Sequence, residues 1–371
     1  MRTTLLALAV SCTVTFLSAQ NDRKFLSLPS GMPASWYATK EAQQAADSVL
    51  KYQFPSGGWA KNIDWHQPAD ADGLKKRKEV IRQMNSPDGR GATIDNKATT
   101  SEMTLLAKVY AATGQKAYRD AFVKGLDYLL EAQYDNGGWP QFYPLFPADK
   151  QGRIPYYNHI TFNDNAMYRV MTLLRKISEN KAPFNALKLS DRYRSLAREA
   201  FDRGITCILR CQIRKDGKLT VWCQQHDEFT LLPAKARAYE LPSFTASHET
   251  VNLIQLLMSL PEPSDTVVEA VSSAVEWLQT HVIRDMRLDS FINEEGKRDS
   301  RLVHQFGSNL WARYYDLQTE EPYVCDRDSR PQPSLEYIGY ERRNGYGWYG
   351  TEPQSVIDAF PMWLQRVRKK D

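Results

Sequence analysis

Two short polar segments carry the residue types that bind a hard metal ion. Residues 93–96 read Thr-Ile-Asp-Asn and residues 161–165 read Thr-Phe-Asn-Asp-Asn. Carboxylate and amide oxygens suit calcium, which accepts both in a flexible geometry. Helix capping is the alternative, because Asp and Asn are favoured N-cap residues, but capping uses one residue in each segment. Asp95, Asn96 and Asp164 are therefore candidate calcium ligands.

Arginines in the later loops suit a substrate that bears carboxylates. Arg237, Arg313 and Arg327 each lie among many polar and aromatic residues, in segments 232–240, 311–317 and 323–328. A guanidinium group binds a carboxylate through two parallel hydrogen bonds. Loop-bracing ion pairs are the alternative for any single arginine. Calcium together with several arginines predicts recognition of a polymer of uronic acids.

A sequence repeat indicates the elements that position these residues. The pattern Gln-x-x-x-Gly-Gly-Trp occurs at residues 53–59 and 133–139, and a looser copy begins at Gln212 and includes Gly217 and Trp222. Each copy ends an amphipathic helical segment, and a second such segment follows after a loop. Repeated helical hairpins place all of these loops on one face. The Gly and Trp of each copy are expected to fold the loop against a helix end.

We therefore expect an all-α fold, an α/α toroid (incomplete α/α barrel) of repeated helical hairpins with long irregular loops on one face. The longest loops are residues 62–98 and 213–246, and long ordered loops are usually functional. A short helix is expected at Asn309 to Leu317, and a last helix begins at Pro353.

Several separate segments resemble the pectate lyases of polysaccharide lyase family 10. They read GGWPQF, ITFNDNAM, TVWCQQHD, ARAYELPS, LWARYYDL and ERRNGYGWYG, and they cover nearly the whole chain after residue 31 in the same order. The resemblance implies an α/α toroid that cleaves polygalacturonate (α-1,4-galacturonan) by calcium-dependent anti β-elimination. The products would be 4,5-unsaturated oligogalacturonides.

The resemblance also implies a role for individual residues. Asp95, Asn96 and Asp164 surround the calcium ion and the substrate carboxylate, and Arg327 is the catalytic base. Substrate binding falls to Arg237, Arg313, Asn96, Lys61 and Lys218, the two lysines serving neighbouring subsites. An arginine base implies an alkaline pH optimum, because free guanidinium stays protonated at neutral pH and nearby cations favour its deprotonation.

The remaining features set the cellular context. Arg2, an apolar run and Leu17-Ser18-Ala19 predict a signal peptide at residues 1–19 and a secreted or periplasmic protein; a lipoprotein signal ending at Cys12 is the alternative. One catalytic domain is expected at residues 20–371, with no membrane span and as a monomer. The net charge of +4 is dispersed and predicts no nucleic-acid partner. Four cysteines remain, without an assignable pairing: Cys207, Cys211, Cys223 and Cys325.

Two other functions fit the same loops. An α/α-barrel glycoside hydrolase needs a pair of carboxyl groups, and its candidates are Glu102, Asp227, Glu240 and Glu249. A non-catalytic protein that binds an acidic polysaccharide needs only exposed aromatic residues. The product separates these functions, because only a lyase leaves an unsaturated sugar that absorbs ultraviolet light.

Overall fold

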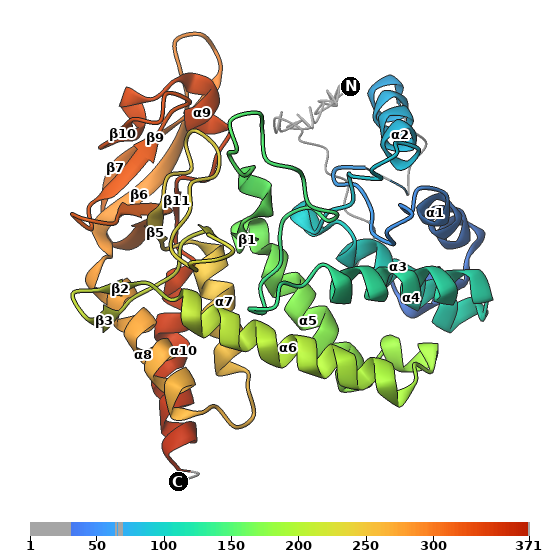
Figure 1. Cartoon of the computed structure of the whole chain (residues 1–371). Coiled ribbons are helices and arrows are strands. Elements are labelled where there is room, and N and C mark those ends of the chain that lie inside the picture. The colour runs from blue at the N-terminus through green and yellow to red at the C-terminus, as the bar shows by residue number, and fades with distance from the viewer. Residues whose placement is uncertain (1–30, 64, 66–69, 370–371) are drawn as a thin grey trace, which may run out of the picture.

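The computed structural model describes residues 31–63, 65 and 70–369. Helical hairpins form one part of the molecule, and most of the strands lie together in a second part built from the C-terminal third of the chain (Figure 1). The predicted signal peptide at residues 1–19 lies outside the described residues. None of the described helices is long and apolar enough to cross a membrane.

The predicted helical hairpins are present. The outgoing helices are α1 (Lys40–Lys51), α4 (Lys116–Glu131), α6 (Asp191–Cys211) and α8 (Asp265–Thr280). The return helices are α3 (Thr100–Thr113), α5 (Ala166–Ser178) and α7 (His248–Met258). The last helix, α10 (Pro353–Arg368), starts at the predicted proline. An additional helix, α2 (Ala71–Met84), lies within the first long loop.

Side-chain caps begin several of these helices. Thr39, Ser190 and Ser264 each accept a hydrogen bond from a backbone amide in the first turn of α1, α6 and α8. Such caps satisfy amides that have no partner within the helix. The apolar faces of the helices then pack into one large core. Local sequence and burial therefore favour the same helix boundaries.

The repeated tryptophans and glutamines hold each loop to a helix end. Each indole N–H donates to a carbonyl in the last turns of the preceding helix, and each glutamine side chain donates to its own loop and to the next outgoing helix. A fourth tryptophan repeats the indole contact outside the predicted repeat. The indole bonds are Trp59 to Val49 (2.8 Å), Trp139 to Leu129 (2.7 Å), Trp222 to Ile208 (2.7 Å) and Trp311 to Leu278 (2.8 Å).

Two glycines of the repeat cannot carry a side chain. Gly57 and Gly137 have φ of +102° and +94°. A Cβ atom at Gly57 would lie 2.2 Å from the carbonyl oxygen of Lys124, and one at Gly137 would lie 2.1 Å from that of Arg203. Glycine permits both the backbone conformation and the close approach. This part of the repeat is therefore structural.

The expectation of an all-α toroid is wrong, because several small sheets complete the fold. The longest strands, β6 (Ile283–Ile292) and β7 (Arg298–Ala312), form an antiparallel ribbon that β11 (Tyr349–Gly350) extends. A second sheet has the order β10-β9-β8-β5, and two strand pairs, β1-β4 and β2-β3, brace the loops. These strands are β5 (Ser243–Thr245), β8 (Tyr314–Asp316), β9 (Pro322–Cys325), β10 (Pro331–Gln332), β1 (Ile160–Thr161), β4 (Gln225–His226), β2 (Arg214–Lys215) and β3 (Lys218–Leu219).

The helix predicted for Asn309 to Leu317 is also wrong. This segment contains the end of β7 and the whole of β8. The side chains from Leu310 to Tyr315 are all buried, including Arg313, so the segment is buried on both sides and has no single buried helical face. Such short buried segments suit a strand as well as a helix. The four cysteines Cys207, Cys211, Cys223 and Cys325 are buried free thiols.

Candidate active site

The repeated tryptophans also position the polar segments before the return helices. The amides of Thr93, Thr161 and Thr245 donate to the main-chain oxygens of Trp59, Trp139 and Trp222 over 2.9, 3.0 and 2.9 Å. Each repeat thus anchors one threonine, and the residues that follow it lead directly into α3, α5 or α7. The predicted metal-binding residues come from the first two of these segments.

Two short 3-10 helices present the predicted ligands. They are η2 (Asp95–Lys97) and η4 (Asn163–Asn165), and they lie against each other. Asn96 and Asp164 occupy the same position, three residues after the anchored threonines, and have φ of 49° and 50°. Asn and Asp are the non-glycine residues that most readily adopt this left-handed conformation. The backbone thus favours these residue types at both positions.

Three carboxylates belong to this site. Asp95 is buried and forms an ion pair with Lys61. The amide of Asp164 donates to the carboxylate of Glu249 over 3.3 Å, which brings the first turn of α7 into the site. Burial raises the pKa of Asp164, the charge of Arg313 lowers it, and the charges of Asp95 and Glu249 raise it further. From the sequence, Glu249 was predicted only as a hydrolase candidate, because no pattern in the neighbouring residues along the chain links it to Asp164.

This set of groups fits a calcium ion. Asp95, Asp164 and the side-chain oxygen of Asn96 are hard oxygen ligands, and mutual repulsion among the carboxylates would be relieved by a divalent cation. Asn96 is held by a hydrogen bond from its side-chain amide to Asn62 (2.9 Å), which leaves its oxygen available. Asp164, His248 and Glu249 also offer ligand atoms within 4.8 Å of one another. The imidazole makes that second set less suited to calcium.

Two of the predicted arginines face these carboxylates. Arg313 is buried, forms an ion pair with Glu249 and donates to the side-chain oxygen of Asn163 over 3.2 Å. Arg237 forms an ion pair with the buried Glu240 at 2.7 Å. The positive charges of both arginines act on Asp164 and lower its pKa, against the larger effect of burial. Glu240 also accepts a hydrogen bond from Tyr346 over 2.9 Å, and Tyr346 contacts Arg313, so the structure places the two arginines near each other.

A group of tyrosines holds the arginines in place. The guanidinium of Arg237 lies 5.5 Å from the ring centre of Tyr239, and that of Arg313 lies 4.6 Å from the ring centre of Tyr346. Arg342 is only 1% exposed and contacts both rings, at 4.1 and 5.3 Å. Its Nε and Nη1 atoms are buried without a hydrogen-bond partner among the described residues. Sequence reasoning missed the role of Arg342, although the run Glu-Arg-Arg at 341–343 contains it.

Arg327 lies at the exposed edge of this group. Its side chain is 63% exposed, pairs with Glu341 at 3.3 Å and contacts the ring of Tyr239 at 5.7 Å. Tyr239 thus joins Arg327 to Arg237, and the structure brings all three predicted arginines to one cluster. Lys218 is different, because it lies on the β2-β3 hairpin, which packs against α8. No described contact joins Lys218 to the carboxylates.

One further residue spans the two sides of the site. Tyr156 begins η3 (Tyr156–Asn158) and is half-buried. Burial raises its pKa, and the charges of Arg237, Glu240 and Asp95 all act on it. Tyr156 is therefore within electrostatic reach of both the metal-binding segment and the arginine loop. It was not predicted, because nothing in its local sequence separates it from the other tyrosines.

The hydrolase candidates have structural partners. Glu102 accepts a hydrogen bond from Trp65 at 2.9 Å, while Glu240 and Glu249 are paired with arginines. Asp227 accepts bonds from the amides of Phe229 and Thr230 in a turn. The described contacts therefore give no pair of these acids facing a common space.

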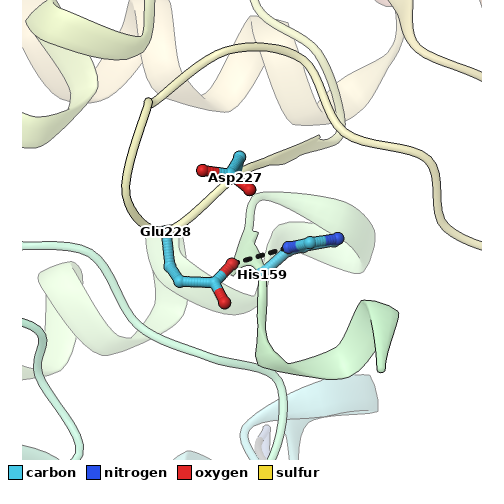
Figure 2. A group of neighbouring side chains, drawn as sticks. All are labelled: His159, Asp227 and Glu228. Carbon is cyan, nitrogen blue, oxygen red and sulfur yellow. Dashed lines mark hydrogen bonds and ion pairs between the residues drawn. The ribbon is translucent and has the colours of Figure 1, made fainter. Parts of the chain in front are cut away.

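A second group of possible metal ligands lies where β1 begins and β4 ends. His159 Nδ1 lies 2.7 Å from a carboxylate oxygen of Glu228, and Asp227 lies beside them (Figure 2). The hydrogen bond between His159 and Glu228 occupies one ligand atom of each residue, and the turn occupies one oxygen of Asp227. This group joins the β1 and β4 segments, and it supplies no carboxylate to the site around Asp164.

Comparison with known proteins gives the family. The family model for pectic acid lyase matches residues 53–357. A solved structure of a single-residue variant of a family 10 polysaccharide lyase from Cellvibrio cellulosa, in complex with trigalacturonic acid, is 34% identical with a TM-score of 0.73, over 89% of this chain and 97% of that one. The structure without the substitution is 33% identical with the same TM-score, over 89% and 96%. No curated protein matches. This chain is a polysaccharide lyase and belongs to family 10, the pectic acid lyases.

Proposed function

We propose that this protein cleaves polygalacturonate by calcium-dependent anti β-elimination and releases 4,5-unsaturated oligogalacturonides. One observation carries the proposal: the carboxylates Asp95, Asp164 and Glu249 meet the guanidinium groups of Arg237 and Arg313 in one site. Carboxylates suit calcium, and arginines beside them suit a substrate carboxylate. The similar lyase bound to trigalacturonic acid supports the same substrate class. Export through residues 1–19 and action as a monomer are part of the proposal.

Asp95, Asn96 and Asp164 would hold the calcium ion. The bound ion supplies positive charge at the substrate carboxylate, where negative charge grows in the transition state. Lys61 forms an ion pair with Asp95. When calcium neutralises that aspartate, the ammonium group of Lys61 can bind the substrate carboxylate instead. Lys61 therefore keeps its predicted role in substrate binding, while Lys218 has no described contact that supports one.

The chemical step is removal of the C5 proton of a galacturonate residue. The electrons of the C5–H bond form the C4=C5 double bond, the bond from C4 to the glycosidic oxygen breaks, and that oxygen takes a proton from water. Arg313 is buried and preorganised by Glu249 and Asn163, so it is suited to stabilise the developing charge on the C6 carboxylate. No pair of catalytic carboxyl groups is needed for this route.

Two arginines are candidates for the base. The resemblance assigns Arg327, which is exposed and loosely paired with Glu341. The contacts support Arg237, because its charge acts on Asp164 and Tyr156. Burial would lower the pKa of Arg237, but its ion pair with Glu240 outweighs burial and raises it. Arg237 can act as the base only if calcium and substrate weaken that pair, which again predicts an alkaline pH optimum.

Lysine substitutions distinguish the two arginines. If Arg237 is the base, Arg237→Lys lowers kcat by at least about a hundredfold, and Arg327→Lys raises KM with a smaller effect on kcat. The reverse pattern assigns the base to Arg327. Equal kcat in both variants and in the unmodified protein would exclude both. Steady-state kinetics across pH 7 to 11 also shows whether the activity rises into the alkaline range.

The reaction type is read from the products. A lyase releases oligomers whose new non-reducing end lacks one water relative to the hydrolysis product. Mass spectrometry of a polygalacturonate digest should find only the dehydrated series. A digest that contains only the hydrated series would favour the hydrolase, and an unchanged polymer would favour a binding protein.

A further inference from the structure

A second place on the molecule has the chemistry of an anion-binding site. A cavity of about 480 Å³ lies between α3, α5 and η5 (Phe184–Leu187). This volume is within the range of roughly 300 to 1,000 Å³ that small-molecule sites usually have. Three basic residues line it, namely Lys108, Arg169 and Lys176. Among the described residues that line it, none is acidic.

The helical spacing explains why these groups face one cavity. Thr100, Thr104 and Lys108 follow one another at intervals of four residues on α3, and Thr172 and Lys176 do the same on α5. Residues four apart lie on the same face of a helix. The two neighbouring return helices (Figure 1) thus turn a hydroxyl-bearing and basic face toward the same space. An ordinary solvent-exposed helix face carries charges of both signs, whereas the charged residues that line this cavity are all basic.

Arg169 marks the end of the cavity nearest the active site. Its Nε atom is buried without a hydrogen-bond partner among the described residues. Burial lowers the pKa of Arg169, and the charge of Asp164 opposes this, so the two side chains lie within electrostatic reach. The Arg169 side chain as a whole is only partly buried and lines the cavity, so it adds positive charge to that space.

Other cationic groups extend the cavity. A second cavity of about 470 Å³ shares Tyr168, Thr172 and Lys176 with the first, and Arg175 lines it. Its acidic residue, Glu179, is paired with Arg175 at 2.9 Å. The space along α5 is therefore bordered by positive charge and by apolar side chains, which suits a sugar ring that bears a carboxylate better than an inorganic ion.

From these observations we infer that the cavity between α3 and α5 binds the carboxylate of a uronic acid, at a site separate from the cleavage site. The choice of a uronic acid rests on the proposed function. Arg169 and Lys176 pair with the carboxylate, and Ser101 and Thr172 offer hydroxyl groups to the sugar. Lys108, which donates to the hydroxyl of Tyr37 over 2.9 Å, adds positive charge. The site holds a released product or another part of the polymer near the catalytic carboxylates.

Galacturonic acid is the probe, because it has no glycosidic bond to cleave. It is titrated into the full chain with calcium present, and the amide NMR signals of Thr104 and Thr172 are followed. Lys176 is exposed at the cavity rim, so Lys176→Glu should fold normally and weaken this binding by at least about fivefold, as expected for reversing one partly exposed charge. Lys369→Glu, at the residue that follows α10, is the control and should bind as the unmodified protein does. Arg169→Gln tests the partly buried arginine.

Three results would overturn the inference. In the first, galacturonic acid shifts only the amide NMR signals of residues near Asp95 and Asp164. The second is unchanged binding at the cavity in both Lys176→Glu and Arg169→Gln. The third is equal shifts with sulfate at the same concentration, which would show an anion site without preference for a uronic acid. Failure of the lyase reaction is a separate result: without unsaturated products the proposed function falls, while galacturonate shifts at Thr104 and Thr172 would still support the cavity.

To distinguish the two sources of ligand, unsaturated trigalacturonate product and intact polymer are compared as competitors with a chelator present, so that the polymer is not cleaved. Displacement of galacturonic acid by the short product at the cavity identifies a product site. Displacement by polymer alone identifies a second polymer-binding site. Displacement by neither contradicts the inference.

Discussion

The two parts of the active site are built in different ways. Asp95 and Asp164 come from a repeated backbone arrangement, in which a tryptophan carbonyl anchors a threonine before each return helix. Arg237 and Arg313 come from loops and strands that do not repeat, and ion pairs and tyrosine rings hold them. Backbone hydrogen bonds fix the carboxylates rigidly, whereas the arginine contacts are those that a substrate carboxylate can replace. The comparison suggests a rigid metal-binding side and an adaptable substrate-binding side.

Removal of a carboxylate from the rigid side should have the largest effect. Asp164→Ala is expected to lower kcat by about 10³-fold, because it removes a proposed calcium ligand and leaves Arg313 and Arg237 without that negative charge. Activity is measured with saturating calcium, and circular dichroism checks the fold. Asp227→Ala is the control, since Asp227 caps a turn, and it should keep most of the activity. Equal activity in both variants would contradict the assignment of Asp164.

Disturbing the repeat itself should act on stability. Gly137→Ala is expected to lower the free energy of unfolding by about 3 kcal/mol, because its Cβ would lie 2.1 Å from the carbonyl oxygen of Arg203. Gly152→Ala is the matched control, because Gly152 also has a positive φ (+77°) but has nothing within 4 Å of the added Cβ. Gly152→Ala should lower the free energy of unfolding by about 1 kcal/mol. Urea unfolding measures both values, and equal losses would show that the close approach contributes nothing.

A buried acid in the helical part gives a smaller, pH-dependent effect. Burial raises the pKa of Glu102 to about 7, although the hydrogen bond from Trp65 lowers it. Its pKa is higher in the folded than in the unfolded state, so the folded protein binds more protons between pH 4.5 and 7, and stability falls as pH rises through this range. Glu102→Gln removes this contribution, which is about 2 kcal/mol between pH 5 and 8. Urea unfolding at both pH values should show a gain for the variant that grows with pH; a gain independent of pH would contradict the raised pKa.

The difference between the repeated part and the non-repeating part of the site also explains which features the sequence could predict. The helical hairpins and the pairs at Asp95 and Asp164 follow from local periodicity and from a repeat of about eighty residues. The β6-β7 ribbon was not predicted, because the alternation in β6 is short: apolar Met286 and Leu288 alternate with Arg287 and Asp289, and the Ser290-Phe291-Ile292 run then breaks the pattern. Glu249 joins the site through Arg313 and Asp164, and Tyr346 joins it through Arg313 and Arg342, across separations that no local pattern indicates. Sequence therefore predicted the repeated half of the site better than the other half.

Calcium-dependent elimination of polygalacturonate by this family 10 lyase can be followed by ultraviolet absorbance. Polygalacturonate is incubated with the full chain, with calcium and after addition of a chelator. We expect a steady rise in absorbance from unsaturated products with calcium, no rise with chelator, and recovery when calcium is restored. Absorbance that does not rise in either condition, or that rises equally with the chelator present, would contradict calcium-dependent elimination.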